Sequence, residues 1–199
     1  MKNVLVLGAT GRTGRLVVQQ LAQVADVNQT VYVRDPNKLS CGGIADLTVV
    51  KGDATDVRKL ADAMMGQDIV ISCLNGDVLS QAKSIVEALK DTEVSRIIWI
   101  TGMGIHREVP GIVGFLLNFL VRKYPEYVMA ADAIADSGVA YTLVRAAHLL
   151  DGETTSYHLT NEGEKIRKNS VTRSAVAKAI VDMVSSEFEG NYSLGITNY

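Results

Sequence analysis

The sequence contains little cysteine and no excess of charge of one sign. Its two cysteines, Cys41 and Cys73, lie far apart and belong to no CxxC motif or Cys/His cluster, so neither a disulfide scaffold nor a metal site is expected. Its 20 Lys and Arg residues are balanced by 22 Asp and Glu residues, for a net charge of −2. Nucleic-acid-binding proteins usually carry a basic excess, so nucleic acid is not an expected partner.

Long hydrophobic runs are also missing. The N-terminal apolar run ends at Gly8 and is too short for a signal peptide. Segment 112–121 is interrupted by Gly114 and Asn118, and it is shorter than the roughly 20 residues of a membrane span. We therefore expect no membrane partner and a cytoplasmic location. A length of 199 residues, 47% hydrophobic and 21% charged, predicts one globular domain over residues 1–199.

Short apolar runs alternate with segments of helical period along the chain. Runs such as 4–7 and 69–71 are nearly continuous, which is typical of parallel strands covered on both faces. We therefore predict an α/β fold: a doubly wound parallel sheet with helices on both faces. The expected strands are 3–8, 30–34, 46–51, 68–74, 96–101, 140–144 and 192–196. The expected helices are 13–25, 56–65, 78–90, 126–137 and 173–186.

Two details of this assignment are specific enough to check. In helix 56–65, the apolar stripe predicted to be buried includes Met64 and Met65. The polar stretch 145–169 has no strong period, and no element is assigned to most of it.

A glycine-rich loop follows the first predicted strand and precedes the first predicted helix. It reads Gly8-Ala9-Thr10-Gly11-Arg12-Thr13-Gly14. Gly8 permits a tight turn, Gly11 lets a pyrophosphate approach backbone N–H groups, and Gly14 allows close packing of helix and sheet. The helix N-terminus then favours phosphate. The position between strand and helix makes dinucleotide binding the favoured interpretation over a turn needed only for packing.

The residue 20 positions after Gly14 is Arg34, at the end of the second predicted strand. An acidic residue there would bind the ribose 2′-OH of NAD, whereas arginine suits the 2′-phosphate of NADP. Arg12 is a candidate second cation, and the neighbouring Asp35 leaves room for NAD. We therefore favour NADP(H) over NAD(H) as the cofactor.

Two later strand ends complete the predicted cofactor site. After the third strand, Asp53 and Ala54 are expected beside the adenine, with Asp53 accepting from its amino group, while Thr55 or Asp56 caps the next helix. After the fourth strand, Leu74, Asn75 and Gly76 are expected along the middle of the cofactor, at the carboxyl edge of the sheet.

These motifs together resemble the atypical short-chain dehydrogenase/reductase superfamily, in its NAD(P)H-binding branch with NmrA-like and biliverdin- or flavin-reductase-like members. The resemblance rests on the glycine loop, on the segments Val33-Arg34-Asp35-Pro36 and Gly52-Asp53-Ala54, and on residues 137–145. It covers nearly the whole chain. It implies a single Rossmann-type domain with a small C-terminal substrate cap, built from loops within about residues 102–170.

The sequence departs from the superfamily in its expected catalytic residues. Conventional members use Tyr-x-x-x-Lys, in which the lysine lowers the pKa of the tyrosine. Here Tyr124, Tyr127, Tyr141 and Tyr157 all lack a lysine four residues later. Tyr124 lies where the resemblance places the tyrosine. Thr101, at the end of the fifth predicted strand, matches the region of the active-site Ser/Thr and is also a candidate cofactor-binding residue. Its hydroxyl donates either to a substrate carbonyl or to a carbonyl at the strand end. Two loop histidines, His106 and His148, are either proton shuttles or surface residues.

Two functions fit these observations. One is hydride transfer from NADPH to a flat conjugated small-molecule acceptor, such as a flavin or quinone, which needs no Tyr-x-x-x-Lys pair because solvent can protonate the product. The other is a non-catalytic NADP(H)-binding regulator that reports redox state to a protein partner. The apolar segment 112–121 lines a substrate pocket, packs in the core, or forms a homodimer contact.

Overall fold

The computed structural model describes residues 1–40, 44, 46–105, 123–164, 166, 168–186 and 190–199, and its centre is an eight-stranded sheet. The strand order is β3-β2-β1-β4-β5-β6-β10-β8, and every neighbouring pair is parallel except β8 with β10. This order confirms the predicted Rossmann-type sheet. The strands are β1 Lys2–Leu7, β2 Val27–Val33, β3 Thr48–Lys51, β4 Ile69–Ser72, β5 Arg96–Gly102, β6 Ala140–Ala146, β8 His158–Thr160 and β10 Tyr192–Thr197.

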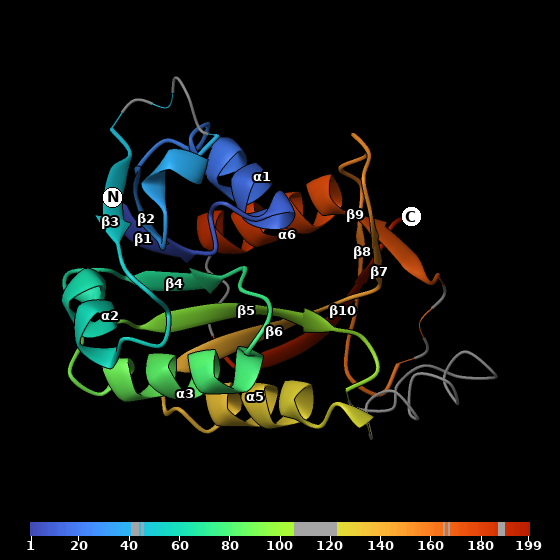
Figure 1. Ribbon diagram of the computed structural model, residues 1–199. Helices are drawn as coiled ribbons and strands as arrows, with labels where there is room; N and C mark the ends of the chain where they lie inside the picture. The colour runs from blue at the N-terminus through green and yellow to red at the C-terminus, as the bar shows by residue number, and fades with distance from the viewer. Residues whose placement is uncertain (41–43, 45, 106–122, 165, 167, 187–189) are drawn as a thin grey trace.

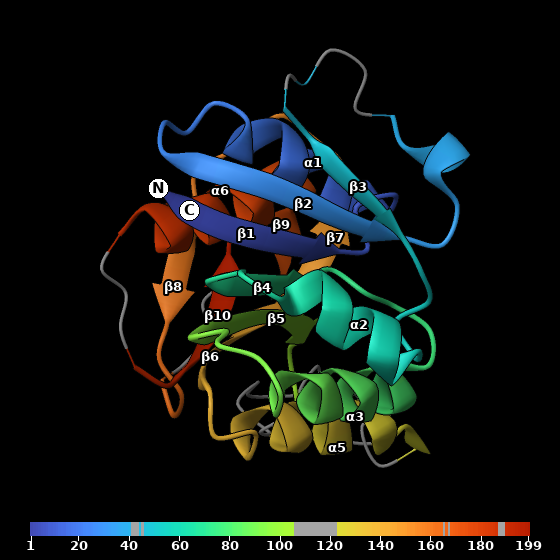
Figure 2. The same ribbon diagram turned by 90° about the vertical axis from the view of Figure 1, so that its left-hand side faces the viewer.

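Helices cover both faces of this sheet, as Figures 1 and 2 show. Helices α1 (Arg12–Leu21) and α6 (Arg173–Ser185) lie on one face. Helices α2 (Val57–Met64), α3 (Val78–Leu89) and α5 (Glu126–Ala135) lie on the other. None of the helices in the described part of the chain is long and apolar enough to cross a membrane.

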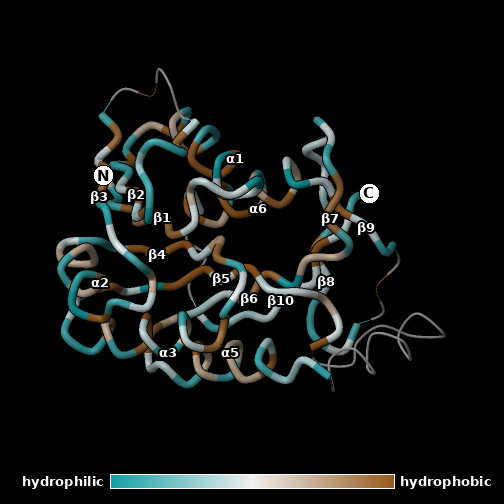
Figure 3. The backbone as a smooth tube through the Cα atoms, viewed as in Figure 1, coloured by the Kyte–Doolittle hydropathy of each residue, from teal (hydrophilic) through white to brown (hydrophobic). Residues whose placement is uncertain are grey.

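The alternation of side chains along β1 explains its continuous apolar run. Val4 and Val6 belong to the core under α1 and α6, whereas Leu5 and Leu7 belong to the core under α2, α3 and α5. All four side chains are fully buried, as a strand between two helical layers requires. Figure 3 shows the same hydrophobic strands between more polar outer segments.

The stretch without a period contains two of the three short strands that the sequence pattern missed. Strand β7 (His148–Leu150) pairs in parallel with β9 (Ser170–Thr172) in a second, two-stranded sheet, and β8 extends the main sheet. Each of these strands has three residues, which is too few to establish a period of two.

Helix ends also differ from the expectation. Helix α2 ends at Met64, so Met65 lies beyond the helix and is 63% exposed rather than buried. Helix α1 ends at Leu21, and Asp26 takes a positive φ of 62° as the chain turns into β2. Both His106 and the apolar segment 112–121 lie outside the described residues, so the homodimer contact stays a prediction.

Candidate functional site

The glycine loop lies at the carboxyl end of β1, where steric contacts leave no room for larger side chains. Gly8 has a φ of +80°, and a Cβ atom there would lie 2.7 Å from the carbonyl oxygen of Cys73. A Cβ atom on Gly14 would lie 2.2 Å from the carbonyl oxygen of Gly8. Glycine at these two positions therefore sets both the turn and the close packing of α1 on the loop.

The N-terminus of α1 lacks the side-chain cap that α2, α3 and α6 have. Side chains of Asp56, Asp77 and Thr172 accept hydrogen bonds from the first-turn N–H groups of α2, α3 and α6. At α1 the N-cap is Gly11, which offers no side-chain acceptor, and the first turn holds no acidic residue. Its first N–H groups and the positive end of its dipole are thus available to an anion, which fits the pyrophosphate of a dinucleotide.

A cavity of about 520 Å³ runs from this loop along the ends of β2 and β3. We refer to it as the adenosine-side cavity. Nine of the predicted cofactor residues line it: Gly8, Thr10, Gly11, Arg34, Asp53, Ala54, Leu74, Asn75 and Gly76.

Asp53 is held in place at the far end of this cavity. Its Oδ1 accepts from the hydroxyl of Thr55 at 2.7 Å and from the Thr55 N–H at 2.9 Å. These two hydrogen bonds are the main causes that lower the pKa of Asp53, and the nearby charge of Arg34 lowers it further. The carboxylate therefore stays ionised and beside Arg34 at neutral pH.

A second cavity, of about 590 Å³, continues from the first toward β5, β6 and β7. We refer to it as the nicotinamide-side cavity. The two cavities share Gly11, Cys73, Leu74 and Asn75, at the boundary between β1 and β4. Parallel α/β sheets bind ligands at this point, where the strand order reverses. Of the remaining predicted residues, Arg12, Thr13 and Thr101 line the second cavity, while Gly14 only shapes the loop.

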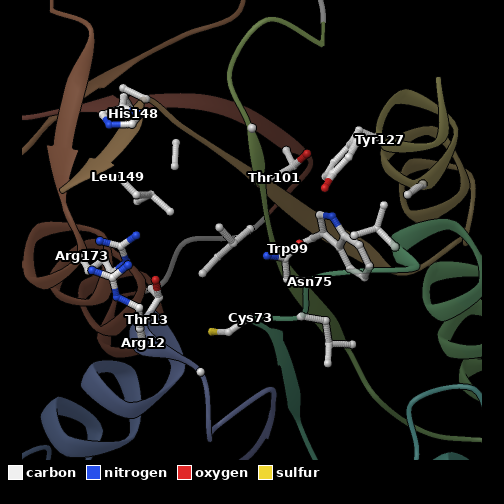
Figure 4. A pocket seen from close by; sticks show the side chains of 18 residues that line it. Arg12, Thr13, Cys73, Asn75, Trp99, Thr101, Tyr127, His148, Leu149 and Arg173 are labelled. Carbon is white, nitrogen blue, oxygen red and sulfur yellow. The ribbon is translucent and has the colours of Figure 1, made fainter. Parts of the chain in front are cut away.

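One wall of the nicotinamide-side cavity carries hydroxyl groups and an indole (Figure 4). Thr101, at the end of β5, is 7% exposed, and its Oγ1 has no hydrogen-bond partner within the described part of the chain. Tyr127 extends from α5 with its hydroxyl directed toward Thr101. Trp99, the single tryptophan of the sequence, lies beside them. A buried hydroxyl without a partner is costly unless a ligand pairs with it.

The tyrosine in this cavity is not the one that the sequence favoured. Tyr124 is 44% exposed and lines neither cavity. The centre of its ring lies 5.6 Å from Lys123 Nζ. Tyr127 is the second residue of α5, and it lines the cavity instead. Both tyrosines lack a lysine four residues later, and the resemblance indicated Tyr124; only the structure shows that Tyr127 lines the cavity.

The opposite wall carries charged groups. Arg12 and Arg173 line it, and both form ion pairs with Asp151, at 2.9 Å for Arg173. Arg12 therefore lines a different cavity from Arg34, which argues against a shared 2′-phosphate site. The exposed His148 also lines the nicotinamide-side cavity. Neither Arg173 nor Asp151 was singled out in the sequence, because no local pattern links them.

Comparison with known proteins decides the family. A family model described as NAD(P)H-binding matches residues 8–187. The chain belongs to this family. The match confirms the resemblance to the atypical short-chain dehydrogenases/reductases, and the fit of the glycine loop to a dinucleotide agrees with it.

Solved structures of similar proteins cover almost the whole of this NAD(P)H-binding chain. A Rossmann-fold NAD(P)-binding family protein from Shigella flexneri is 34% identical, with a TM-score of 0.84 over 100% of this chain and 94% of that one. A short-chain dehydrogenase/reductase from Veillonella parvula, in complex with NADP, is 26% identical, with a TM-score of 0.83 over 99% and 94%.

A curated relative adds an activity. Quinone oxidoreductase 2 of Escherichia coli is 25% identical over 146 residues, which are 71% of this chain and 47% of that protein. The chain thus spans about half the length of this relative. An oxidoreductase is therefore among the proteins that this NAD(P)H-binding chain resembles.

Proposed function

We propose that the protein is an NADPH-dependent reductase of a flat conjugated acceptor, such as a flavin or a quinone. The observation that carries this proposal is the buried, unpartnered Thr101 hydroxyl in a cavity that continues from the glycine loop. The cavity, at about 590 Å³, has room for a ring system beside the nicotinamide, and the apolar residues that line it include Trp99 and Leu149. The quinone reductase activity named for the Escherichia coli relative agrees with an acceptor of this kind.

In this proposal NADPH supplies the hydride, and the protein supplies binding and orientation. The N-terminus of α1 holds the pyrophosphate, and the residues shared by the two cavities lie along the middle of the cofactor. Thr101 Oγ1 donates a hydrogen bond to a carbonyl oxygen of the acceptor, which stabilises the charge that develops there during hydride transfer. Tyr127 holds a second hydroxyl on the same side.

NADPH is the proposed cofactor in preference to NADH. Arg34 lines the adenosine-side cavity at the end of β2, where an acidic residue would favour NADH. Asp35 is occupied elsewhere: its Oδ1 accepts from the Asn37 N–H at 3.1 Å and caps the 3-10 helix η1 (Pro36–Lys38). The similar Veillonella parvula protein that contains NADP supports the same choice.

The test is steady-state oxidation of NADPH in the presence of riboflavin, flavin mononucleotide or a soluble quinone. We expect turnover with at least one of them, and a loss of about 10- to 100-fold in kcat/KM for Thr101→Val, which removes one hydrogen bond to a developing charge. Binding is followed separately through quenching of Trp99 by the nicotinamide. Tight binding of NADPH without turnover of any acceptor would reject the reductase and leave the regulator.

A further inference from the structure

The charged wall of the nicotinamide-side cavity is built by the pairing of two short strands. Register places Leu150 of β7 opposite Thr172 of β9, so the next residues, Asp151 and Arg173, emerge side by side. Arg173 Nη1 donates to Asp151 Oδ1 at 2.9 Å. The Ser174 hydroxyl donates to the Gly152 carbonyl oxygen at 2.7 Å and fixes the same two segments to each other.

Asp151 also contacts the glycine loop. Its second oxygen, Oδ2, accepts from Arg12 Nη2, so one carboxylate lies between two guanidinium groups. Figure 4 shows Arg12 and Arg173 on the same wall of the cavity, across from Thr101 and Tyr127. Three segments that are far apart in the sequence therefore converge on one side of the cavity.

The charges on this wall do not cancel. Two arginines face one aspartate, and the Arg173 side chain is only 14% exposed. Arginine has five N–H donors, and the ion pair with Asp151 uses one nitrogen of Arg173 among the described residues. Arg173 lines the cavity, and the planar fork of donors of its guanidinium group suits a carboxylate or phosphate.

The cofactor has two anionic parts, and each fits a site other than the charged wall. The pyrophosphate fits the uncapped N-terminus of α1, beside Gly11, where the two cavities meet. The 2′-phosphate fits Arg34, which lines the adenosine-side cavity. Arg173 lines only the nicotinamide-side cavity, where the acceptor lies in the proposed function.

We propose that Arg12 and Arg173 form a subsite for an anionic group, a carboxylate or a phosphate, carried by the acceptor. Asp151 holds the two guanidinium groups in position and competes with the anion for them. This inference rests on the proposed reductase function, and it narrows the acceptors to those with a negative group beside the conjugated rings.

The experiment compares flavin mononucleotide with riboflavin, which differ only in a phosphate. Isothermal titration calorimetry measures their binding to the protein saturated with NADP⁺, which cannot donate a hydride. We expect flavin mononucleotide to bind more tightly than riboflavin. Arg173→Gln should lower the affinity for flavin mononucleotide by about 10- to 100-fold, because it removes a charge-assisted contact. The affinity for riboflavin should stay unchanged. Asp151→Asn should raise the affinity for flavin mononucleotide several-fold, because it removes the carboxylate that competes with the phosphate for the two arginines.

Two further variants separate the subsite from general effects. Arg15→Gln makes the same charge change on α1, in a residue that lines neither cavity, and should alter neither affinity. Arg173→Lys keeps the charge but loses the fork of donors, so it should fall between wild type and Arg173→Gln. Thermal unfolding of each variant shows whether it folds. If Arg173→Gln does not fold, Arg173→Lys supplies the test.

Three results would overturn the inference. They are equal affinities for the two flavins, no binding of flavin mononucleotide, or an Arg173→Gln variant whose affinity falls for NADP⁺ and not for flavin mononucleotide. The last would assign the arginines to the pyrophosphate. Because NADP⁺ supports no turnover, these outcomes are independent of the proposed function, which fails separately if NADPH reduces no acceptor.

Discussion

At the scale of single residues, charge and orientation decide the chemistry of the site. Arg34 and Asp53 lie together at the adenosine end, while Thr101 and Tyr127 lie together at the other. Sequence position alone predicted the first pair, because each residue follows a strand of the parallel sheet. It predicted only Thr101 of the second pair, since the family resemblance indicated Tyr124 rather than Tyr127.

Arg34→Ala tests the recognition of the 2′-phosphate. Loss of a charge-assisted contact of about 1.5–3 kcal/mol should lower the affinity for NADPH by about 10- to 100-fold. The affinity for NADH should change by less than about twofold. Fluorescence titration through Trp99 measures both affinities. Equal losses for the two cofactors would mean that Arg34 does not bind the phosphate.

Tyr127→Phe and Tyr124→Phe form a matched pair. We expect Tyr127→Phe to lower kcat/KM by about tenfold, because its hydroxyl lies in the cavity beside Thr101. Tyr124→Phe should leave the rate unchanged, because Tyr124 lines neither cavity. Steady-state kinetics with one acceptor checks both. A loss confined to Tyr124→Phe would restore the tyrosine expected from the family resemblance.

At the scale of elements, the contact between α1 and the glycine loop sets the cofactor site. The helix begins directly after Gly11, and its close approach to Gly8 depends on the absence of a side chain at Gly14. The sequence predicted this unit because a strand, a turn and a helix follow one another within about twenty residues. It did not predict β7 and β9, because each is stabilised by a partner about twenty residues away rather than by its own pattern.

Gly14→Ala tests this packing. Alanine favours a helix by about 1 kcal/mol over glycine, but its Cβ would lie 2.2 Å from the Gly8 carbonyl oxygen, a backbone atom that cannot rotate away. Overpacking of about 1–3 kcal/mol should therefore prevail, lower the stability and weaken NADPH binding. Urea denaturation and cofactor titration measure the two effects.

Gln19→Ala is the control for this substitution, at an exposed position of the same helix. It should change the free energy of unfolding by less than about 0.5 kcal/mol. A Gly14→Ala protein as stable as wild type would show that α1 can move away from the loop at no cost.

At the scale of the whole molecule, side-chain contacts join C-terminal segments that are distant in the sequence. Tyr157, in the loop before β8, donates to Asp182 Oδ2 of α6 at 2.8 Å. Burial is the main cause that raises the pKa of Tyr157 to about 12, and the hydrogen bond to Asp182 adds to it. The folded protein thus favours the neutral phenol.

This shift gives stability a definite dependence on pH. The contribution of Tyr157 is fully present below about pH 10, the pKa of an unfolded tyrosine, and is lost as the pH rises toward about 12. Tyr157→Phe should cost about 1 kcal/mol at pH 8, and its difference from wild type should narrow above pH 10. Urea denaturation at both pH values measures this. A constant difference would mean that the phenol ionises equally in both states.

By itself, the sequence determined the order along the chain of the main-sheet strands other than β8 and of the described α-helices, as well as the glycine loop and the adenosine end of the site. These features depend on local periodicity and on residues that directly follow a strand. Only the tertiary structure decided which tyrosine faces the cavity and that Asp151 lies between Arg12 and Arg173. The direction of α5 and the register of β7 with β9 bring these groups together, and both arise from packing between segments that are distant in the chain.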